Sequence, residues 1–167
     1  MIRKLGGTFR CVIFVTELPI LHAYLCLRLF KYIKQHKIVS YYISTTLKNT
    51  SFEEAIEKTT AALKEEGFGV LTEIDIKATL KKKLDADFYN YTILGACNPH
   101  MAHQALQAEN KIGTMLPCNV IVQEREAGTV EVSAVDPAAS MMAVQNDSLA
   151  TIAKEVQEKL TKVIKSI

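Results

Sequence analysis

From Val39 onward the sequence alternates between short strand patterns and capped helix patterns, and this order constrains the fold more than any other feature. Apolar residues at every second position predict strands over 39–47, 68–76, 89–96, 119–124 and 129–135. Helical spacing of apolar residues predicts helices after each of the first three strands and after the last. The order strand–helix–strand–helix–strand–helix–strand–strand–helix predicts a two-layer α+β fold. We expect helices packed on one face of a single mixed or mostly antiparallel sheet.

Three helix starts carry capping signals. Ser51 and Glu54 have the spacing of a capping box, in which the hydroxyl accepts a backbone N–H bond while the glutamate reaches back to the cap. Asn98 followed by Pro99 is a favoured pair at the start of a helix. Asp147 is expected to cap the last helix, which carries a continuous apolar stripe.

Residues 1–38 differ in character from the rest of the chain, and we expect them to lie outside a single domain that covers 39–167. The segment begins with basic residues and continues into an apolar run, as signal peptides and anchors do. Glu17 and Arg28 interrupt that run, and a charge at the membrane centre costs about 2.5–3.5 kcal/mol on insertion scales. Three interpretations stay open: an over-extended start, an amphipathic appendage and a membrane anchor.

Charge and composition exclude several classes of function. The chain has 20 Lys and Arg against 18 Asp and Glu, a net charge of +2, without the clustered positive charge that nucleic-acid binding needs. The basic run over 81–83 is followed by Asp85, and we interpret it as a solvated helix face. Four scattered cysteines do not make a disulfide scaffold. We expect a cytoplasmic protein with no nucleic-acid or membrane partner, or a membrane-associated or exported one if residues 1–38 are genuine.

Residues able to do thiol or metal chemistry cluster between positions 93 and 120. Cys97 ends one predicted strand and Cys118 begins the next, each in a turn that contains proline. His100 and His103 follow Cys97 at helical spacing. A thiol at a helix N-terminus is expected to have a lowered pKa and to be reactive or metal-binding. The competing interpretation of Cys97 is a small buried residue that fills the end of a strand.

Cys97 and Cys118 bracket one helix and its return loop, so we expect both sulfurs near the same sheet edge. The pair can form a disulfide if the Cα atoms lie within about 7 Å, or share a soft metal if they lie slightly farther apart. With His100 and His103 the two cysteines supply the four ligands of a tetrahedral zinc site, although the spacing matches no familiar zinc signature. Surface or cleft positions are the competing interpretation of both histidines.

Met141 and Met142 are possible thioether ligands for copper(I), with core packing as the competing interpretation. The sequence contains no Gly-rich phosphate loop, nucleophile elbow or paired carboxylates. It therefore presents no catalytic constellation, favours a protein that is not an enzyme, and specifies no cofactor.

Several short motifs follow one another in a characteristic order: Ser40-Tyr41-Tyr42, Leu94-Gly95-Ala96-Cys97-Asn98-Pro99, Leu116-Pro117-Cys118-Asn119-Val120 and Val135-Asp136-Pro137. With these motifs the chain resembles domain-of-unknown-function family 302, small bacterial and archaeal proteins, over about residues 39–167. The resemblance implies a compact two-layer α+β domain, admits dimers and implies no activity. Members of the family often begin near the Ser-Tyr-Tyr strand, which favours an over-extended start for residues 1–38.

The leading functional hypothesis is a small domain that binds a small-molecule or metal ligand, without catalysis, in a cleft at the two cysteine turns. The residues expected to line this cleft are Cys97, Asn98, Pro99, His100, Pro117, Cys118 and Asn119. One alternative is a thiol-based redox or soft-metal protein that handles zinc or copper through Cys97 and Cys118. Another is a structural or oligomerisation module in which both cysteines are inert.

The first predicted strand carries Tyr41 and Tyr42 on opposite faces, so one ring must point away from the helix layer. Tyrosine is enriched at protein interfaces because its ring buries area while its hydroxyl stays hydrated. The sequence therefore predicts a weak-to-moderate homodimer through the uncovered sheet face or an edge.

Overall fold

The computed structural model describes residues 40–144 and 146–167, so the predictions for residues 1–38 lie outside the described part of the chain. The strands are β1 (Tyr42–Lys48), β2 (Gly69–Asp75), β3 (Asn90–Cys97), β4 (Cys118–Glu126) and β5 (Thr129–Val135). The helices are α2 (Phe52–Glu65), α3 (Ile76–Leu84), α4 (Pro99–Ala108), α5 (Pro137–Ser140) and α6 (Asp147–Ser166), with short 3-10 helices η1 (Ile112–Met115) and η2 (Met141–Ala143). Within the described ranges, no helix is long and apolar enough to cross a membrane.

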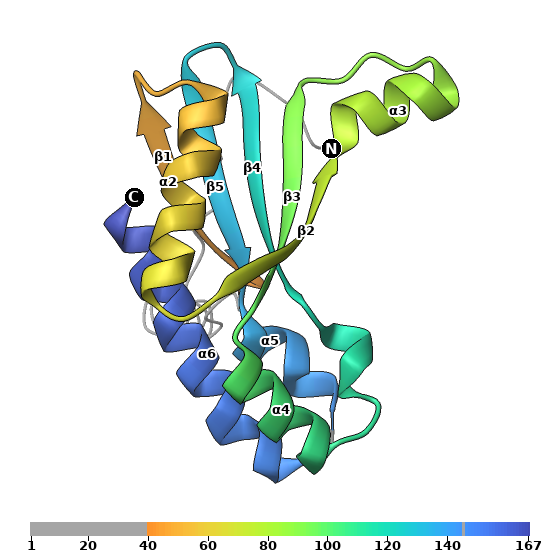
Figure 1. Ribbon diagram of the computed structural model, residues 1–167, viewed down its shortest axis with the longest axis vertical. Helices are drawn as coiled ribbons and strands as arrows, with labels where there is room; N and C mark the ends of the chain where they lie inside the picture. The colour runs from red at the N-terminus through yellow and green to blue at the C-terminus, as the bar shows by residue number, and fades with distance from the viewer. Residues whose placement is uncertain (1–39, 145) are drawn as a thin grey trace, which may run out of the picture. The chain divides into compact units, whose positions relative to one another are not determined.

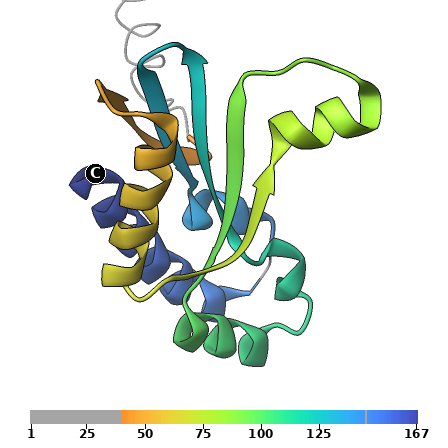
Figure 2. The same ribbon diagram turned by 45° about the horizontal axis from the view of Figure 1, so that its top comes forward.

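The strands form one sheet in the order β1-β5-β4-β3-β2, and every neighbouring pair is antiparallel. Helices α2 and α6 pack against each other and against β1, β4 and β5 (Figure 1). Figure 2 shows the same two helices side by side, with α3 standing apart from them beyond the end of β2. The predicted two-layer α+β fold is confirmed, and the sheet is antiparallel rather than mixed.

The main hydrophobic core lies between the sheet and the two long helices. Alternate residues of the central strands point toward this layer and are buried, while α2 and α6 supply the facing aliphatic side chains. The largest of these buried side chains are Leu63, Leu94, Val120, Val122, Val130, Val132, Leu160, Val163 and Ile164. Burial of each contributes about 1.5–3 kcal/mol to folding, so the core holds the helix layer against one face of the sheet.

The helix ends follow the predicted caps with two differences. The Ser51 hydroxyl accepts the Glu54 N–H bond at 3.1 Å, but the Glu54 carboxylate pairs with Lys58 at 2.9 Å instead of reaching back to the cap. Helix α6 is capped by Asn146, whose side-chain oxygen accepts the Ser148 N–H bond at 3.0 Å. The prediction that Asp147 is the cap is wrong, because Asp147 already lies in the first turn of the helix.

Strand β2 departs from the simple alternation predicted for residues 68–76. A β-bulge between Val70 and Thr72 inserts Leu71 as an extra residue. Val70 packs against the main core, whereas Thr72 and Ile74 beyond the bulge lie on the opposite face. The single-face prediction fails beyond Val70, because one extra residue moves every later side chain to the other side of the sheet.

Tyr41 and Tyr42 do not lie on opposite faces as predicted. Strand β1 begins at Tyr42, and Tyr41 lies just before it, where its carbonyl oxygen accepts the Asp136 N–H bond at 2.8 Å. Their rings meet edge to face with centroids 5.0 Å apart, and both border the sheet face that lacks the long helices. We call this surface the open face. The residues whose strand positions place them on it include Tyr42, Ser44, Tyr91, Ile93, Asn119, Ile121, Gln123, Glu131 and Ser133.

The one-sided core leads to a stability prediction. Leu160 on α6 is fully buried, whereas Leu84 at the end of α3 is 70% exposed. We expect Leu160→Ala to lower the free energy of unfolding by about 2–5 kcal/mol, because it removes buried methyl groups and leaves a cavity. The matched control Leu84→Ala should change it by less than about 0.5 kcal/mol. Urea unfolding followed by circular dichroism measures both, and equal effects would contradict this description of the core.

The homodimer predicted from the sequence stays a prediction, and the open face and the β2 edge are the surfaces where we expect it to form. Tyr41 is 72% exposed, and Leu71 and Ile74 on the edge strand β2 are exposed as well. With residues 1–38 removed, sedimentation should show association in the high micromolar range that Tyr42→Ser weakens. Monomer alone at these concentrations would rule the dimer out.

Candidate functional site

The two cysteine turns lie at the same end of the sheet, as the sequence predicts. Strand β3 ends at Cys97, and the next residue, Asn98, caps α4 by accepting the Met101 N–H bond at 3.3 Å. Strand β4 begins at Cys118, which stands directly opposite Ala96 in the β3–β4 register. The ends of two central strands and the start of α4 therefore meet at this point.

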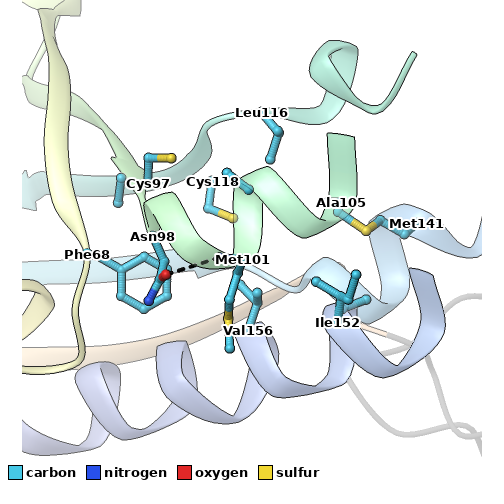
Figure 3. Close-up of a pocket in the computed structure, with 13 residues that line it drawn as sticks. Phe68, Cys97, Asn98, Met101, Ala105, Leu116, Cys118, Met141, Ile152 and Val156 are labelled. Carbon is cyan, nitrogen blue, oxygen red and sulfur yellow. Dashed lines mark hydrogen bonds between the residues drawn. The ribbon is translucent and has the colours of Figure 1, made fainter. Parts of the chain in front are cut away.

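The thiols themselves point to opposite sides of the sheet. Cys118 shares the helix-facing side with its partner Ala96, so Cys97, one residue further along β3, lies on the other side. Figure 3 shows the two side chains leaving their strands in opposite directions. Both cysteines are free. A disulfide needs Cβ vectors that converge, so this backbone does not favour one between Cys97 and Cys118.

The electrostatic environment of the thiols differs from the prediction for Cys97. Burial raises the pKa of Cys97, so the thiolate expected at the start of α4 is not favoured. Burial, together with the neighbouring Cys97, raises the pKa of Cys118 to about 11. Both side chains are therefore thiols at neutral pH.

The four predicted zinc ligands are not assembled into one site. His100 and His103 are exposed on α4, on the side of the helix away from the buried Ala105, whereas Cys118 points into the core. In the described part of the chain, no three His, Cys, Asp or Glu side chains gather closely enough to hold a metal ion.

The remaining predicted binding residues are divided among several places. Pro117 packs over Gly95, where an added Cβ atom would lie 2.8 Å from the Pro117 ring and in contact with Thr72. Asn119 is exposed and lies on the open face, while Pro99 is exposed in the first turn of α4. The seven residues predicted to line one cleft therefore do not line a single hollow.

Cys97, Asn98 and Cys118 do border one cavity, which we call the sulfur cavity (Figure 3). Its other walls are mostly apolar side chains from the α2–β2 turn and the α4, η1–β4, η2 and α6 segments, including Phe68, Met101, Leu116, Met141, Ile152 and Val156. The cavity holds about 30 Å³, whereas one water molecule needs about 10–15 Å³ on the same measure. It is therefore too small for an organic ligand in this conformation.

A much larger hollow of about 480 Å³ lies on the open face, and we call it the tyrosine hollow. Its lining includes Tyr41, Tyr42, Tyr91, Asn119, Ile121, Gln123, Arg125, Glu131 and Ser133. Apart from Asn119, the predicted site residues do not include these side chains. The signal was present in the sequence, because Gln123 and Glu131 alternate with the apolar residues Val122 and Val132 and so belong to the opposite face of the sheet.

Polar groups inside the tyrosine hollow are held by their neighbours. The Ser133 hydroxyl donates to the Glu131 carboxylate at 2.9 Å, and the Tyr89 hydroxyl donates to the Gln123 side-chain oxygen at 3.3 Å. Burial raises the pKa of Tyr91, with smaller contributions from Tyr89, Tyr41 and Glu131. Tyr91 therefore remains a neutral hydroxyl that can donate a hydrogen bond at any physiological pH.

Thiol reactivity provides a direct check on this site. At pH 7 we expect Cys118 to react with iodoacetamide only on unfolding, and half-buried Cys97 to react slowly, because both are protonated and shielded. Peptide-resolved mass spectrometry separates them from Cys11 and Cys26. Rapid labelling of Cys118 in the folded protein would contradict this arrangement.

Comparisons with known proteins agree with the observed fold. A solved structure described as "uncharacterized conserved protein DUF302 from Bacillus stearothermophilus" is 28% identical to this chain, with a TM-score of 0.70. The match covers 76% of this chain and 98% of that one. No curated protein matches. The model of the family described as "Domain of unknown function DUF302" matches residues 43–167, three quarters of the sequence, and the chain belongs to this family.

Proposed function

We propose that this domain binds a small planar molecule in the tyrosine hollow, without catalysing a reaction. The observation that carries the proposal is the aromatic lining of the tyrosine hollow, about 480 Å³ on the open face against about 30 Å³ at the cysteine turns. Two other surface hollows of about 400 and 410 Å³ have no aromatic side chain in their linings. Pockets for small organic ligands are typically about 300–1,000 Å³, with aromatic walls and a few polar groups that orient the ligand. The tyrosine hollow meets both conditions. We therefore keep the hypothesis of a ligand-binding domain but place the binding site on the open face instead of at the cysteine turns.

The chemistry of the lining indicates the kind of ligand. Tyr42 and Tyr91 offer ring faces or edges on which a planar ring system can stack. Gln123 offers hydrogen bonds to the edge of such a ring. Arg125 and Glu131 place one positive and one negative charge in the same lining, so the hollow has no net charge to select an ion. The ligand best matched to this surface is an uncharged or zwitterionic ring compound with hydrogen-bonding groups on its rim.

The alternative functions receive less support from the site. Thiol redox chemistry through Cys97 and Cys118 requires sulfurs that meet and a reactive thiolate, whereas these thiols diverge and have raised pKa values. A structural or oligomerisation module remains compatible with an open face covered by a second copy. A ligand and a partner would then compete for Tyr42 and its neighbours, which makes self-association a distinguishable outcome of the same experiment.

A fragment screen by NMR tests the proposal. We expect planar heteroaromatic fragments to shift backbone amide signals of Tyr91, Gln123 and Glu131, with little effect around Cys118. Tyr91→Ala should weaken the best fragment by at least about tenfold, since ring–ring contacts are worth about 0.5–1.5 kcal/mol and the hydroxyl adds a hydrogen bond. Leu71→Ala serves as a control on exposed surface outside the hollow.

Two outcomes would contradict the proposal. Shifts that cluster around Met101 and Cys118 would return the ligand to the cysteine turns. Shifts of open-face signals that depend on protein concentration, with no response to any fragment, would assign the face to self-association instead.

A further inference from the structure

We propose that the sulfur cavity is a binding site for a soft monovalent cation, copper(I) or silver(I), held by Cys118, Met101 and Met141. The proposal is independent of the tyrosine hollow and concerns the other side of the sheet. It also differs from the predicted zinc and cysteine-pair sites, because it uses neither histidine and does not require Cys97.

Four sulfur-bearing residues line the sulfur cavity, and the three proposed ligands among them come from separate segments. Cys118 is the first residue of β4, Met101 lies in the first turn of α4, and Met141 opens η2. All three line the sulfur cavity (Figure 3). Cys118 and Met101 belong to the main core, whereas Met141 packs against a smaller cluster around Ala105 and Leu149. The cavity therefore lies where the two hydrophobic clusters meet.

Hydrogen bonds fix the backbone of the segments that carry these ligands. Asp136, which caps α5 just before Met141, accepts bonds of 2.8 and 2.7 Å from the Gln157 side chain on α6. Asn146 ties the start of α6 to the end of α4 by donating to the Ala108 carbonyl at 3.0 Å. These hydrogen bonds hold the backbone around the sulfur cavity in place. The methionine side chains still have three rotatable bonds, so their sulfur atoms can move toward an ion.

Cys118 has the exposure and direction expected of an anchoring ligand. Its residue is only 8% exposed, and its side chain points toward the helix layer where the cavity lies. It is buried and forms no disulfide. The observation that carries the proposal is that this buried thiol lines the same cavity as the two thioethers.

The size and chemistry of the cavity select the class of ion. About 30 Å³ accommodates a bare ion but excludes the hydration shell that hard cations retain. The walls are apolar and sulfur-rich, and thiolate and thioether ligands favour copper(I) over the ions that prefer oxygen or imidazole. Zinc lacks its usual additional ligands, because no cluster of three His, Cys, Asp or Glu occurs among the described residues.

Charge and protons balance on binding of the ion without any electron transfer. The monovalent ion forms a bond to the Cys118 sulfur, and the thiol proton leaves to solvent as that bond forms. The thiolate and the ion cancel each other's charge, and the thioethers of Met101 and Met141 add neutral ligands. The complex is therefore neutral, which suits an apolar cavity where an uncompensated charge would be strongly destabilised.

Competitive titration of the reduced full-length chain tests the site. Copper(I) supplied with a chromogenic chelator should bind in a Cys11→Ser/Cys26→Ser background with one strong equivalent and give thiolate-to-copper absorption in the near ultraviolet. Met101→Leu and Met141→Leu should each weaken this equivalent by at least about tenfold, with little loss of stability because the side-chain volume is conserved. Met142→Leu is the matched control, since Met142 is 73% exposed and does not line the cavity.

Cys118→Ser should abolish the strong equivalent, whereas Cys97→Ser should leave it in place. If Cys118→Ser fails to fold, the two methionine variants still decide the question. The proposal is overturned if neither methionine variant weakens binding, if Met142→Leu weakens it equally, or if the bound copper depends on Cys97 instead of Cys118.

Discussion

Burial of only one face of the sheet determines the rest of this structure. The valines of β4 and β5 that point toward α2 and α6 are fully buried, and their neighbours along each strand must then point the other way. Hydrophobic burial holds the helix layer in place and fixes the strand register, because a one-residue slip would exchange the two faces. Which residues lie in the core and which line the open face both depend on this register.

The same alternation explains the separation of the two cysteines. The sequence places Cys97 and Cys118 at adjoining strand ends, and the structure confirms this. The two cysteines lie close together along the sheet but on different faces. Cys118 lies on the same face as Val120, which is the helix-facing side, and Cys97 lies on the other face. Cys118 is thereby joined with methionines from α4 and η2, whereas Cys97 lies on the side of the sheet away from the main core. Motif spacing alone cannot distinguish these cases, because it does not specify which residues of the two strands are paired.

Much of the fold was predictable because its signals are local. The Ser51 and Asn98 caps, the alternation in β4 and β5 and the apolar stripe of α6 each depend on residues a few positions apart. The predictions that were wrong concern positions where the structure depends on contacts between residues far apart in the sequence. The bulge at Leu71 depends on how β2 meets β3, and the choice of Asn146 over Asp147 as a cap accompanies a bond to Ala108 on another helix. The Tyr41 ring lies beside Tyr42 because Tyr41 precedes strand β1, where the alternation of side chains between the two faces does not apply.

Cysteine scanning along β4 tests the one-sided burial most directly. In a background without native cysteines, single cysteines at positions 119, 121 and 123 should react rapidly with a charged thiol reagent at low protein concentration. Cysteines at positions 120 and 122 should react only as fast as the protein unfolds, because these side chains are fully buried against the helices. Similar rates at all five positions, or faster reaction at 120 and 122, would contradict the account.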